Sequence, residues 1–123
     1  KNRMTGLAVL KQAYQLLDDP KGAASAGEQD LVAVNQIYSE LWYREHTAPF
    51  QPLDSLQLPL LLSWRCLPAM AYGVAMLLCL NDEEKPYTQF QALYERAAAH
   101  TGGPYGKRRD TLFGNAGEQE KTV

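Results

Sequence analysis

The sequence lacks the local patterns that mark most active sites and cofactor sites. Its one glycine cluster, at 102–106, follows a predicted helix and contains no Gly-Lys-Ser or Gly-Lys-Thr, so it is no phosphate-binding loop. The two histidines, His46 and His100, fall at predicted helix ends, far apart and without metal-ligand spacing. We therefore expect no metal site and no cofactor.

Cysteine is scarce as well. Cys66 and Cys79 lie in one apolar segment that we interpret as helical, where their spacing of 13 residues separates them by about 20 Å. A disulfide needs Cα atoms within about 7 Å, so we expect two buried thiols in a reducing compartment. Neither has the electropositive, partly exposed setting of a nucleophile, and the carboxylates at 82–84 lie in a charged, solvated turn. The sequence predicts that the chain is not an enzyme.

Neither a strong charge bias nor a membrane-length apolar run is present. The net charge is −2 and the isoelectric point is near 5.6, which argues against a surface that neutralises many phosphates. In the most hydrophobic region, 60–80, Arg65 and Pro68 leave an apolar stretch of about 15 residues, whereas a membrane-spanning helix needs about 20. We expect a buried central helix there. We also expect no signal peptide, because the first predicted helix carries Lys11 and Gln12.

Helical periodicity is what the sequence does contain. Apolar residues recur at intervals of three and four, with Thr5 as the predicted first N-cap and Pro68 at the first helical position or at a kink. Helices are predicted at 5–17, 28–45, within 60–80, and from Pro86 to about His100. We predict an all-α fold, a small bundle of about four helices, with a helical domain at 1–100 and an extended, flexible C-terminal tail at 101–123.

The predicted connections differ in character. The stretch 21–27 is rich in Gly, Ala and Ser and has no apolar period, which predicts an exposed loop that tolerates insertions. The stretch 46–59 contains three prolines and several leucines, so we expect an extended segment that packs over the core. Small residues around Gly73 would let a neighbouring helix approach closely.

Aromatic residues gather around the end of the predicted helix at 28–45. Tyr38, Trp42, Tyr43 and Phe50 have the large amphipathic rings that indicate either a core or a contact surface, and both interpretations stay open here. We expect Tyr38 and Trp42 to face inward and the other two to face outward. Including the tail, the candidate interface residues are Tyr43, Phe50, Lys107, Arg108, Arg109, Leu112 and Phe113.

Four blocks, in this order, resemble small proteins encoded in prophages of Gram-positive bacteria. They are NQIYSELWY at 35–43, FQPL at 50–53, LPAMAYGVAMLL at 67–78 and FQALY at 90–94. More loosely, the chain resembles the head–tail connector (adaptor or head-completion) proteins of tailed phages. This resemblance implies a structural subunit that forms a ring next to the portal and presents its tail to a neighbour. It implies portal and tail proteins as partners, DNA passing through the lumen without sequence-specific contact, and a place in the virion or, during assembly, in the bacterial cytoplasm.

Two other functions remain open. One is a small cytoplasmic regulatory or interaction protein that binds a partner protein or DNA through the basic triplet at 107–109 and the aromatic cluster, although such a triplet is more often a solvated hinge. The other, which we favour least, is a membrane-associated helical protein based on 66–80. We expect no membrane partner.

Overall fold

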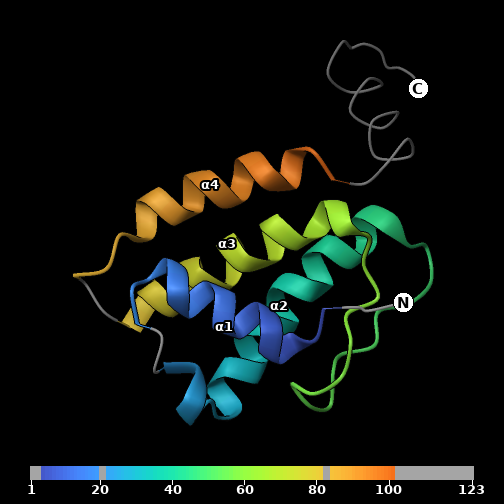
Figure 1. Ribbon diagram of the computed structural model, residues 1–123. Helices are drawn as coiled ribbons and strands as arrows, with labels where there is room; N and C mark the ends of the chain where they lie inside the picture. The colour runs from blue at the N-terminus through green and yellow to red at the C-terminus, as the bar shows by residue number, and fades with distance from the viewer. Residues whose placement is uncertain (1–3, 20–21, 82–83, 102–123) are drawn as a thin grey trace.

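The computed structural model describes residues 4–19, 22–81 and 84–101, which form a helical body (Figure 1). Its elements are α1 (Gly6–Leu16), α2 (Glu28–Glu45), α3 (Leu67–Leu78) and α4 (Tyr87–Ala99), with short 3-10 helices η1 (Gly22–Ser25), η2 (Trp64–Cys66) and η3 (Cys79–Asn81). In these residues there is no β-strand, only an isolated bridge between Thr5 and Pro59. The predicted all-α fold with four helices is confirmed. Asp82, Glu83 and the predicted tail beyond Thr101 lie outside the described residues.

α1 begins and ends at signals that the sequence carries. The hydroxyl of Thr5 accepts a hydrogen bond from the N–H of Ala8 (3.1 Å) and caps the first turn, as predicted. After the helix, Asp18 has a φ of 59°, a left-handed conformation that aspartate tolerates better than most residues. The inward face of α1 carries the buried residues Val9, Leu10 and Ala13.

α2 spans the residues that the periodicity predicts. At its start, Asp30 accepts a hydrogen bond from the N–H of Gly27 (2.8 Å) and places a negative charge near the positive end of the helix dipole. The buried stripe recurs at helical spacing and comprises Val34, Ile37, Tyr38, Leu41 and Trp42. This stripe fixes which side of α2 faces the other helices.

α3 is the central helix and contacts each of the other three (Figure 1). It begins only at Leu67, after the 3-10 turn η2, and Pro68 lies in its first turn, where a missing N–H costs nothing. A Cβ placed on Gly73 would lie 2.8 Å from Ile37 of α2 and 2.9 Å from Tyr94 of α4. The predicted close approach therefore occurs on two sides. None of the described helices is long and apolar enough to cross a bilayer.

α4 begins after Pro86 and runs antiparallel to α3 (Figure 1). Phe90, Tyr94 and Ala98 form its buried side, as the sequence indicates. At its end, Thr101 is buried and its hydroxyl donates to the carbonyl of Ala98 (2.7 Å). The described chain thus ends packed against α4, at the end of the bundle where α3 begins.

The connections at 21–27 and 46–59 differ from each other as expected, but the prediction of an exposed loop at 21–27 is partly wrong. Within 21–27, the residues Gly22–Ser25 form η1 instead of an open loop, and Ala23 is buried. Gly22 lies against the ring of Tyr14 so closely that a Cβ there would collide with it. An insertion at this point would disturb that contact. The stretch 46–59, by contrast, is non-helical and packs along α1 and α2, as predicted.

Candidate protein-contact surface

Two of the predicted interface residues can be placed, and they differ in exposure. Tyr43 is 52% exposed on α2, and its hydroxyl accepts a hydrogen bond from the backbone N–H of Phe50 (3.0 Å). The ring of Phe50 is half-buried and meets Tyr38 and Trp42 edge-on, at centroid distances of 5.1 and 6.1 Å. Tyr43 thus faces outward, as predicted, whereas Phe50 faces inward, so the prediction that Phe50 faces outward is wrong. The other candidates, Lys107, Arg108, Arg109, Leu112 and Phe113, lie outside the described residues.

The aromatic cluster at the end of α2 packs as part of the core. Tyr38 is 2% exposed and Trp42 is 7% exposed, which confirms that both rings face inward. The indole N–H of Trp42 donates to the carbonyl of Ala48 (2.7 Å), and the imidazole of His46 stacks on the indole at 3.8 Å. Of the two interpretations of the cluster, the core therefore fits its geometry.

The same cluster belongs to a series of polar contacts that fixes the segment 46–63 along α2. Asn35 donates to the carbonyl of Leu53 (3.0 Å) and accepts from its N–H (2.7 Å). The hydroxyl of Tyr38 accepts from the N–H of Leu61 (3.0 Å), and Nε2 of His46 lies 2.8 Å from the carbonyl oxygen of Leu61. These side chains satisfy backbone groups that no helix or strand satisfies.

Glu45, Ser63 and Cys66 form the nearest approach to a catalytic cluster. The Glu45 carboxylate accepts from the backbone N–H of Ser63 (2.9 Å) and from its hydroxyl. Burial alone would raise the pKa of Glu45, but hydrogen bonds from Ser63 and Cys66 and the neighbouring His46 hold it below its usual value. Burial and then the Glu45 charge raise the pKa of the Cys66 thiol to about 12. A protonated, buried thiol is the opposite of an activated nucleophile, so the cluster holds the start of η2 against α2.

A groove of about 520 Å³ lies between α2 and α4, and three of its polar side chains, Glu40, Arg44 and Tyr94, bond to the protein itself. The hydroxyl of Tyr94 donates to Glu40 (2.5 Å), and the guanidinium of Arg44 donates to the carbonyl of Ala98 (3.0 Å). Burial, followed by the hydrogen bond to Glu40, raises the pKa of Tyr94 well above its usual value. These contacts join α2 to α4, and they do not point at a ligand.

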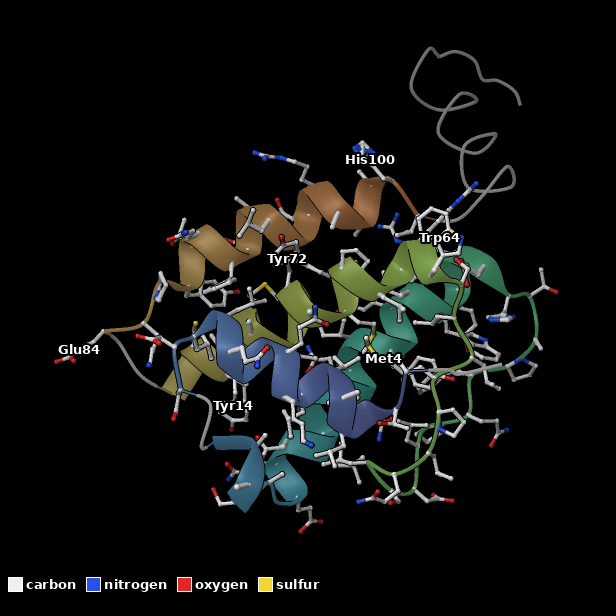
Figure 2. The ribbon with its side chains drawn as sticks, in the orientation of Figure 1. Met4, Tyr14, Trp64, Tyr72, Glu84 and His100 are labelled. Atoms are coloured by element: carbon white, nitrogen blue, oxygen red, sulfur yellow. The ribbon has the colours of Figure 1, made fainter. Side chains whose placement is uncertain are left out.

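A second groove, of about 290 Å³, is apolar and lies between α1 and the start of α3; we name it the Trp64 groove. On one side it is lined by Met4, Gln12 and Leu16, and on the other by Trp64, Leu67, Pro68, Ala71 and Tyr72. Figure 2 labels Met4, Trp64 and Tyr72 among them. None of these eight side chains is charged. Trp64 is 75% exposed and Leu16 is 40% exposed, so two large apolar side chains border the hollow. Exposed apolar surface around a tryptophan is typical of protein contact sites.

The sequence pattern did not single out this groove. Trp64 belongs to a run of apolar residues, and the composition alone predicts that it is buried with its neighbours. In the structure it lies in η2, one turn before α3, so its ring leaves the buried stripe, and the Arg65 guanidinium lies 5.6 Å from its centroid. Its direct neighbour Arg65, a charge within an apolar run, is the one local signal of a surface position.

Neither a metal site nor a similarity to known proteins indicates the function of the chain. Among the residues that the structure describes, no three or more His, Cys, Asp or Glu side chains gather as a metal site would require. The chain matches no known protein family, no curated protein and no solved structure.

Proposed function

We propose that this chain is a non-catalytic helical subunit that works by contact with other protein chains, and that the Trp64 groove is a main contact surface. The supporting observation is an exposed tryptophan beside an uncharged hollow between two helices. Tryptophan contributes strongly to protein contacts because a large area leaves water while few rotatable bonds are fixed. A helix or loop of a partner with one apolar side chain would fill such a hollow.

The chemistry of the described polar groups supports a role without catalysis. Cys66 is buried with a pKa raised to about 12, and its neighbour Glu45 is held by Ser63. His46 is stacked on Trp42 and contacts a backbone carbonyl. Glu45 and His46 bond to the segment 46–63, and the Cys66 thiol is buried and protonated, which supports a role without a free acid, base or nucleophile here.

Within this class, we propose a structural subunit of a phage or prophage particle, of the head–tail connector kind, that assembles into a ring next to the portal. The order of the four sequence blocks supports this assignment, and the blocks include half of α2 and all of α3. Its partners would be further copies of the chain, the portal and tail proteins. DNA would pass through the lumen without sequence-specific contact.

Assembly experiments with matched variants test this proposal. The purified chain, alone and with a portal protein, is examined by light scattering after gel filtration and by electron microscopy. We expect rings or co-complexes for the wild type, their loss in Trp64→Ser, and no change in Val32→Ser, an exposed apolar residue on α2 outside the groove. A monomer under all conditions contradicts the connector function, and equal assembly of both variants contradicts the role of the groove.

The regulatory alternative depends on Lys107, Arg108 and Arg109, which lie outside the described residues. No contact among the described residues favours DNA over protein as a partner, and the net charge of −2 does not favour DNA either. We therefore do not develop it as a second function.

A further inference from the structure

We propose that the Leu112–Phe113 pair of the same chain occupies the Trp64 groove in the free subunit. The topology places the end of α4 at the same end of the bundle as the groove. α4 runs antiparallel to α3, so Thr101, at the end of α4, lies at the end of the bundle where η2 and α3 begin (Figure 1). Figure 2 shows His100 and Trp64 at this same end.

The chain between Thr101 and Leu112 is long compared with the helix that forms one wall of the groove. Leu112 is eleven residues after Thr101, and an extended chain of eleven such steps spans up to about 36 Å. α3, which forms one wall of the groove, has 12 residues and is therefore only about 18 Å long. The extended span is about twice the length of this wall.

The chemistry of the groove selects this pair. The lining side chains are apolar or uncharged, so a ligand must fill the hollow with apolar surface and place its charges outside. In 102–123, Leu112 and Phe113 are the only adjacent large apolar residues. The basic triplet at 107–109 would remain in solvent.

This inference goes beyond the proposed function, because it requires no second chain. Its consequence is that the groove is covered in the free subunit, and that a partner must displace the Leu112–Phe113 pair to reach Trp64. Docking and assembly at this surface would then compete. Leu112→Ser/Phe113→Ser should remove this competition.

Tryptophan fluorescence tests the inference without any partner. The chain has two tryptophans, and the difference between the wild type and Trp64→Phe isolates the signal of Trp64 from that of the buried Trp42. In Leu112→Ser/Phe113→Ser we expect the Trp64 emission to shift to longer wavelength and its quenching by acrylamide to rise. Val123→Ser, which also removes an apolar side chain beyond Thr101, should change neither. Helical circular dichroism and the emission of Trp42 confirm that each variant is folded.

Two results would overturn the inference. One is a Trp64 that is quenched equally in the wild type and in the double variant. The other is protection that disappears on dilution, because the occupant would then belong to a second copy. Protection that is independent of concentration, together with a failure to form rings, would retain this inference and reject the connector function.

Discussion

The two tryptophans of this chain have similar sequence surroundings but differ in exposure to solvent. Trp42 and Trp64 each lie among apolar residues and beside an aromatic or basic neighbour, yet one is 7% exposed and the other 75%. Trp42 is held by Tyr38, His46 and a hydrogen bond to a backbone carbonyl. Trp64 stands at the edge of a hollow that the described residues leave open.

The difference follows from the segment that crosses each ring. The stretch 46–63 returns along α2 and covers Trp42, because Asn35, Tyr38 and Glu45 satisfy its backbone groups. The corresponding space between α1 and the start of α3 has no such covering segment among the described residues. Burial of an aromatic ring therefore depends on where a distant segment finds hydrogen-bond partners, as well as on helical periodicity.

The largest expected effect comes from truncating the two tryptophans in parallel. Trp42→Ala should lower the free energy of unfolding by about 3–5 kcal/mol, because it leaves a core cavity and frees the carbonyl of Ala48. Trp64→Ala should cost less, about 1 kcal/mol, because the described core does not enclose this ring and only the proposed contact with Leu112–Phe113 is lost. Urea denaturation followed by circular dichroism measures both. Similar costs for the two variants would mean that Trp64 is buried in solution to the same degree as Trp42.

Removing one polar contact to the covering segment should have the next largest effect. Asn35→Ala breaks both hydrogen bonds to the buried Leu53, which should cost about 1–3 kcal/mol because a donor and an acceptor lose their partner. Gln36→Ala, at the exposed neighbouring position, serves as the control and should stay within about 0.5 kcal/mol. If Asn35→Ala matches this control, the segment is held by packing alone and the explanation for the burial of Trp42 is wrong.

The regions around Trp42 and Trp64 also show how much of the fold and of the contact surface can be predicted from the sequence. The bounds of α2 and the position of α4 follow from periodicity and from Pro86, because these signals are local. The burial of Ala23 and the exposure of Trp64 depend on contacts between distant segments. A pattern of apolar residues says which side chains favour burial, and it does not say which helix face lacks a neighbour. The Trp64 groove was missed for that reason.

A smaller effect on the free energy of unfolding is expected at Gly73, on the buried side of α3. This site is tightly packed, whereas the Trp64 groove is a hollow. In Gly73→Ala the new methyl would meet Ile37 and Tyr94 at 2.8 and 2.9 Å. Overpacking costs about 1–3 kcal/mol, and the higher helix propensity of alanine returns about 1 kcal/mol, so we expect a net loss of about 1 kcal/mol in urea denaturation. In an Ile37→Val background, which removes the methyl that contacts this position at 2.9 Å, the loss should shrink. Strictly additive costs would show that these side chains already have room.

Tyr14 on α1 is half-buried, and its exposure lies between those of Trp42 and Trp64. Replacing it should have the smallest effect on stability, and this effect should appear only at alkaline pH. Burial, followed by a hydrogen bond to Asp30 (2.8 Å), raises the pKa of Tyr14 from 10.0 to about 12. Because the folded state favours the protonated phenol, its contribution to stability is complete below pH 10 and is lost as the pH rises toward 12. Tyr14→Phe should therefore lose less stability than the wild type between pH 8 and about 12, as measured by urea denaturation across this range. Parallel losses in the two proteins would show that the phenol is as solvated as in the unfolded chain, and would place Tyr14 with Trp64 instead of between the two tryptophans.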